Sequence, residues 1–88
     1  MPELSRFYGI IIKMQYFDNE KHHTPHIHAY YGESIAEISL EGDMLAGKMP
    51  IKQFRIIQAW LAIHEEELMN AWNNAVEGKK FDKIEPIK

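Results

Sequence analysis

Pro50 and Gly78 enclose the longest stretch of the chain without a helix breaker. Proline is favoured at the first position of a helix, where its missing N–H is not needed, and glycine is favoured just past the end. The spacing predicts one helix over about residues 50–77. At 1.5 Å per residue this helix would be ~42 Å long, whereas a globule of this chain length is about 30 Å across. The helix must therefore bend or extend beyond the rest of the molecule.

The sequence before Pro50 alternates between apolar and polar residues, as half-buried strands do. Predicted strands cover about residues 7–16, 26–31, 34–40 and 44–48. Short connections between consecutive strands favour an antiparallel meander, because parallel neighbours need long crossovers. We therefore predict a single α+β domain over residues 1–88, with a three- or four-stranded antiparallel β-meander packed against one long C-terminal helix, and a tail at 79–88.

Apolar residues occupy two lines on the predicted helix. The line expected to cover the sheet consists of Ile51, Phe54, Ile57, Leu61, Leu68, Trp72 and Ala75. A second line, on roughly the opposite side, consists of Ile56, Trp60 and Ile63. A helix that is apolar on two sides is buried on two sides. Either the N-terminal segment or the tail folds over the second line, or this line binds a partner, which would be a cognate small protein or a second copy in a homodimer.

Composition narrows the classes of function. The net charge of −3 supplies no surplus of positive charge for a nucleic-acid backbone, so a nucleic-acid-binding regulator is the least favoured hypothesis. The chain has no cysteine, so a metal would need nitrogen and oxygen ligands. No signal peptide and no apolar run of about 20 residues is present, and we expect a soluble, cytoplasmic protein without a membrane segment.

Four of the five histidines fall within seven positions, at the start of the second predicted strand. In an extended strand His26 and His28 share one face, about 6.6 Å apart. Two such imidazoles are typical ligands of zinc, nickel or a similar divalent transition metal, with a third ligand from elsewhere. The candidates for that third ligand are His22, His23, His64, Asp18 and Glu20.

Two other interpretations of the histidines remain open. In the first they are structural, and hydrogen-bond to the backbone or to Glu33 and Glu37. In the second His26 and His28 are the catalytic residues of a small ribonuclease and transfer protons without a metal. The phosphate would then be held by one of the cations near the strands, which are Arg6, Arg55 and Lys13.

Four segments together resemble a widespread family of small bacterial proteins that is known only as a domain of unknown function. They are Met1–Ile10, Thr24–Ala29, Trp60-Leu61 and Lys83–Ile87, so the resemblance extends over essentially the whole chain. Members of the family are often encoded beside a second small protein. The resemblance therefore implies a component of a candidate toxin–antitoxin module that binds a cognate protein.

The strand motif carries the most specific part of this resemblance. The family's usual pattern is Pro-Pro-His-Phe-His-Ala, which Pro25, His26, His28 and Ala29 match. The chain departs from it with threonine at position 24 and isoleucine at position 27. The two histidines of the predicted site thus belong to the family's pattern.

Overall fold

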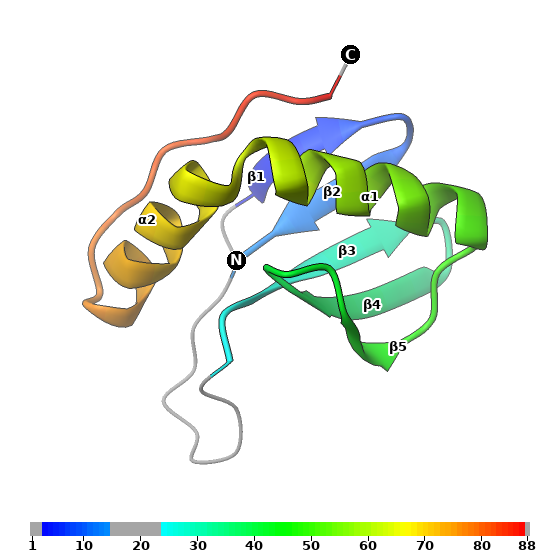
Figure 1. Cartoon of the computed structure of the whole chain (residues 1–88), viewed down its shortest axis with the longest axis horizontal. Helices are drawn as coiled ribbons and strands as arrows, with labels where there is room; N and C mark the ends of the chain where they lie inside the picture. The colour runs from blue at the N-terminus through cyan, green and yellow to red at the C-terminus, as the bar shows by residue number, and fades with distance from the viewer. Residues whose placement is uncertain (1–2, 15–23, 88) are drawn as a thin grey trace.

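The described part of the molecule is a five-stranded antiparallel sheet with two helices. The computed structural model describes residues 3–14 and 24–87. In chain order the elements are β1 (Glu3–Phe7), β2 (Ile10–Lys13), β3 (His26–Tyr31), β4 (Ser34–Ser39), β5 (Met44–Gly47), α1 (Ile51–Ile63) and α2 (Glu65–Val76). The strands neighbour one another in sequence order, and α1 lies across one face of the sheet (Figure 1). The predicted α+β class and antiparallel meander are confirmed, although the described strands number five rather than three or four.

The predicted first strand, residues 7–16, is wrong, because a turn interrupts it. Tyr8 and Gly9 both have positive φ, 48° and 78°, and Phe7 pairs with Ile10 across them. Two-residue turns with positive φ at both positions match the twist of a hairpin. Tyrosine rarely adopts positive φ, so only Gly9 marked this turn in the sequence. The hairpin makes β1 and β2 out of one predicted strand, and Tyr16 lies outside the described residues.

The later strands agree closely with their predicted bounds. β3 matches 26–31, whereas β4 and β5 each end one residue earlier than predicted. A two-residue turn at Gly32 and Glu33 joins β3 to β4, with Gly32 at φ 57°, which favours glycine. The turn fixes the register, so that Tyr31 pairs with Ser34, and Ile27 with Ile38.

The predicted single helix at 50–77 is interrupted at His64, which ends α1 and precedes α2. His64 has φ −110° and ψ 30°, outside helical geometry. The next three residues are glutamates in the first turn of α2, where negative charge is favourable because of the helix dipole. Nδ1–H of His64 donates a hydrogen bond of 2.7 Å to Glu67 Oε1. Of the two alternatives for so long a helix, bending is therefore confirmed.

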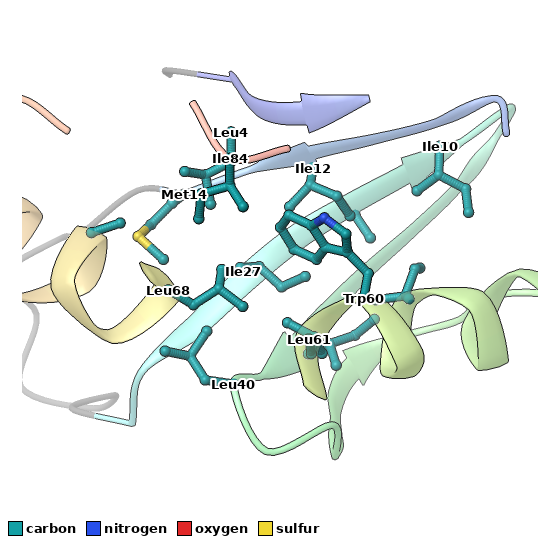
Figure 2. Close-up of a cluster of buried hydrophobic side chains, with 14 of the residues drawn as sticks. Leu4, Ile10, Ile12, Met14, Ile27, Leu40, Trp60, Leu61, Leu68 and Ile84 are labelled. Carbon is teal, nitrogen blue, oxygen red and sulfur yellow. The ribbon is translucent and has the colours of Figure 1, made fainter. Parts of the chain in front are cut away.

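One face of the sheet carries the hydrophobic core (Figure 2). Residues of α1 and α2 pack on it, among them Ile57, Leu61, Leu68 and Trp72. Ile51, predicted to belong to this layer, is exposed instead, because it is the first residue of α1. No helix formed by residues 3–14 and 24–87 is both long and apolar enough to cross a membrane.

The second apolar line of the predicted helix does not form one surface. Trp60 is fully buried, with its ring 5.3 Å from that of Phe7. Its Nε1–H donates a 2.8 Å hydrogen bond to the carbonyl of Glu85, and the tail also donates from the Ile84 N–H to the Leu4 carbonyl. The tail thus covers Trp60. Ile56 is half-buried against the core, and Ile63 is 64% exposed.

Candidate metal centre

The register of β3 and β4 brings two histidines and a glutamate together on the face of the sheet opposite the core. His28 pairs directly with Glu37, and His26 precedes His28 by two residues on the same face. The neighbouring residues Ile27 and Ile38 point the other way, since both are fully buried in the core. Alternation along one hairpin therefore points the cluster residues away from Ile27 and Ile38, although the ring of His26 contacts the core at Trp72.

The three side chains converge. Glu37 Oε1 lies 3.0 Å from His28 Nε2 and 3.9 Å from His26 Nε2. The imidazole rings are 5.2 Å apart between centroids, at 78° to one another. One ligand atom from each residue lies within 4.8 Å of the other two. In a tetrahedral zinc site with bonds of about 2.0–2.1 Å, ligand atoms are about 3.4 Å apart, so small side-chain shifts suffice to bind an ion.

His26 is oriented by the backbone. Its Nδ1–H donates a 2.8 Å hydrogen bond to the Thr24 carbonyl, which leaves Nε2 as the nitrogen with a free lone pair. Its ring also packs against Trp72 of α2, with centroids 5.2 Å apart. Metal-bound histidines usually donate their other N–H in this way, and the bond fixes both tautomer and ring orientation.

His28 is held less completely. Its Nε2–H donates to Glu37, because a carboxylate only accepts. Its Nδ1 is buried and has no hydrogen-bond partner among the residues that the structure describes. When an ion binds Nε2, the proton of the neutral ring moves to Nδ1. A buried N–H without an acceptor costs about 1–3 kcal/mol, which weakens binding.

The cluster is open on its carboxylate side. The side chains of His26 and His28 are 11% and 14% exposed, whereas that of Glu37 is 36% exposed. An ion can therefore approach from the side of Glu37, and a further ligand can reach it from solvent.

The structure places the other predicted ligands elsewhere. His64 lies at the junction of α1 and α2, bonded to Glu67 and 5.7 Å from the ring of Trp60. It does not belong to the group formed by His26, His28 and Glu37, which is the one such group within residues 3–14 and 24–87. The remaining candidates lie outside the described residues, namely Asp18, Glu20, His22 and His23.

Glu37 is the ligand that the sequence analysis did not propose, since it considered this residue only as a hydrogen-bond partner. The sequence did contain a signal for the position of Glu37. A two-residue turn at positions 32 and 33 places Tyr31 opposite Ser34. Each further pair then lies one residue earlier on the first strand and one residue later on the second. His28 is thereby opposite Glu37, as observed.

Comparison with protein families places the chain in a family. The family model described as a domain of unknown function (DUF4160) matches residues 9–73, which is most of the chain and includes all three cluster residues. The chain belongs to this family. No curated protein and no solved structure matches it. The predicted membership is confirmed, and DUF4160 carries no assigned activity that the cluster would have to explain.

Proposed function

We propose that this DUF4160 domain binds a divalent transition metal through His26 Nε2, His28 Nε2 and a carboxylate oxygen of Glu37. The observation that carries the proposal is that one ligand atom from each of these residues lies within 4.8 Å of the other two, beside a carboxylate that is 36% exposed. The backbone bond that points His26 Nε2 into the cluster supports it further. Two imidazoles and one carboxylate suit zinc, and also iron or nickel.

The described residues provide three protein ligands, and this number indicates the kind of site. Structural zinc sites are closed by four protein ligands, whereas catalytic sites use three and leave a position for water or substrate. The cluster therefore supports an ion that reacts or exchanges ligands, rather than one that only holds the fold. Because His28 Nδ1 has no acceptor among the described residues, we expect an affinity about 10–100-fold below that of a site with both imidazoles supported.

Metal content of the untagged protein tests this proposal. The His22→Ala/His23→Ala variant serves as the background, so that any ion that needs these two histidines is not counted. We expect about one zinc or nickel ion per chain after extensive dialysis. Glu37→Gln and His26→Ala should each lower the affinity at least about tenfold by calorimetry, because they remove a ligand atom.

His64→Ala is the matched control for the histidine variant, since it removes an imidazole that lies outside the cluster. It should bind the ion as the background protein does. Equal affinity in the Glu37→Gln, His26→Ala and background proteins would exclude the site.

Trp72 gives a second readout. Its ring lies 5.2 Å from that of His26, so a paramagnetic ion such as Ni²⁺ or Co²⁺ in the cluster should quench its fluorescence. Trp72 is the one tryptophan left in a Trp60→Phe background. Quenching that saturates at one equivalent and disappears in His26→Ala supports the site. Quenching that persists in that variant places the ion elsewhere.

A metal-free ribonuclease is the second candidate, favoured by the hydrogen bond between His28 and Glu37. A carboxylate that orients an imidazole, with a second imidazole beside it, resembles the acid–base pairs of many hydrolases. The two candidates differ in the effect of a chelator. Cleavage of RNA that survives EDTA and is lost in His28→Ala would favour the ribonuclease, whereas no cleavage by the intact chain would exclude it.

Action within a two-gene toxin–antitoxin module, through binding of a cognate small protein, is a separate proposal. Support comes from the family resemblance and from Ile63, whose side chain is 64% exposed on α1. Co-expression with the neighbouring gene product and pull-down would test it. Ile63→Asp should abolish capture, and Lys52→Asp, also on α1, should not. Failure of the intact chain to capture the product would refute it.

A further inference from the structure

Lys13 lies next to the cluster on the neighbouring strand. It pairs directly with His28, which in turn pairs with Glu37, so the three residues form a row across β2, β3 and β4. Directly opposite residues of antiparallel strands share a face, with their Cβ atoms about 4.5–5.5 Å apart. The side chain of Lys13 therefore starts on the same face of the sheet as the cluster, next to His28.

Among the residues that the structure describes, no carboxylate forms an ion pair with Lys13. Glu3 pairs with Lys13 on its other side, yet its carboxylate accepts a 2.8 Å hydrogen bond from Arg6. The ammonium instead lies 5.1 Å from the ring centroid of Tyr30. An aromatic ring attracts a cation without cancelling its charge.

The summed charge of the proposed ion, Glu37 and Lys13 is positive, which favours binding of an anion. A divalent ion with Glu37 leaves one positive charge, and Lys13 adds another. The ion also keeps an open coordination position when its protein ligands are the three that the described residues provide. Of the other cations considered in the sequence, Arg6 is paired with Glu3, and Arg55 is exposed on α1, the helix that covers the opposite face of the sheet.

We propose that the metal-loaded cluster and Lys13 together bind a phosphate group, with one oxygen on the ion and another accepting hydrogen bonds from Lys13 Nζ. This inference rests on the proposed metal site and names its ligand class, which is inorganic phosphate or a phosphate monoester. A phosphate suits the site because it carries close to two negative charges and several acceptor oxygens.

Cobalt-loaded protein in the His22→Ala/His23→Ala background tests the inference, because the visible spectrum of Co²⁺ changes when its ligands change. Titration with inorganic phosphate should change this spectrum in a saturable way. Lys13→Gln should weaken phosphate binding at least about tenfold, since it removes a charged hydrogen-bond donor. The affinity for Co²⁺ without phosphate should stay the same. Lys52→Gln, on α1, is the control and should bind phosphate normally.

The outcomes separate this inference from the metal proposal. If Co²⁺ does not bind at the cluster, the metal site itself is refuted. Three results would refute only the phosphate inference when Co²⁺ does bind at the cluster. Phosphate would leave the spectrum unchanged, would bind Lys13→Gln as tightly as the background protein, or would bind as tightly without metal. Acetate that binds as tightly as phosphate would overturn the proposed ligand class. Tighter binding of phenyl phosphate than of inorganic phosphate would identify the monoester as the ligand.

Discussion

The two faces of the hairpin formed by β3 and β4 use alternate residues of the same two strands for different purposes. On one face Ile27 and Ile38 are paired and fully buried under the helices. On the other face His28 and Glu37 are paired, and their polar atoms meet each other. The same register fixes both pairs. Substitutions on the first face should therefore change stability, and substitutions on the second should change binding.

The largest effect on stability is expected at Ile38. Ile38→Ala removes buried methyl groups and leaves a cavity, which should lower the free energy of unfolding by about 2–5 kcal/mol. Ile35, on the other face of the same strand, is 52% exposed, and Ile35→Ala should change it by no more than about 0.5 kcal/mol. Urea denaturation of both variants measures the difference. Equal losses would contradict the separation of the two faces.

Glu37→Gln should give the converse result. The change keeps the size of a partly exposed side chain, so unfolding in the absence of metal should shift by less than about 1 kcal/mol. Added zinc should stabilise the unsubstituted protein and stabilise the variant much less, because only a ligand that binds the native state raises stability. Thermal unfolding with and without zinc is the measurement. A variant that is strongly destabilised without metal would show that Glu37 is structural.

The pH dependence of metal binding should follow from the ligands. Protons compete with the ion for the imidazole nitrogens and the carboxylate, so the affinity should fall as the pH is lowered from 7.5 to 5.5. Calorimetry in buffers of different ionisation enthalpy would count the protons released. An affinity that does not depend on pH would argue against imidazole ligands.

Trp60→Phe should have a smaller effect on stability. The substitution removes the hydrogen bond to the Glu85 carbonyl and part of a buried ring, and we expect a loss of about 1–3 kcal/mol. The tail should also become more accessible, which limited proteolysis near residue 85 would detect. Unchanged proteolysis would show that this hydrogen bond does not hold the tail.

The smallest effect concerns the pair of Glu3 and Arg6. The hydrogen bond from Arg6, helped by its charge, lowers the pKa of Glu3, so its contribution to stability is present at neutral pH and lost as the pH falls through that lowered pKa. Arg6→Gln should raise the pKa of Glu3 toward the ordinary value, which an NMR titration measures. Stability at pH 7 should hardly change, because the pair is at the surface. An unchanged pKa would contradict this assignment.

Local sequence signals predicted most of the sheet. The alternation in β3 and β4 and the turn at Gly32 gave both strands within one residue. The hairpin at Tyr8 was missed because its turn places a tyrosine at positive φ, which residue preferences disfavour. The break at His64 was missed because neither proline nor glycine lies there, and the three glutamates that follow were not used as the acidic first turn of a second helix.

The candidate site was predicted in part. His26 and His28 follow from alternation within one strand, which is a local property. Glu37 is nine residues from His28 in sequence, and its position depends on the register across the turn. His64 could not be placed because the direction in which the helices cross the sheet depends on packing between distant residues. The burial of Trp60 likewise depends on a distant segment, because its ring hydrogen-bonds to Glu85 of the tail, 25 residues away in sequence.

Anomalous diffraction at the zinc edge, from crystals of the untagged protein with one equivalent of zinc, tests the central claim most directly. We expect one peak about 2.0–2.2 Å from His26 Nε2, His28 Nε2 and a carboxylate oxygen of Glu37. A zinc peak only at His22, His23 or His64 would contradict the account. So would a map without any zinc peak, in which the hydrogen bond between His28 and Glu37 is intact.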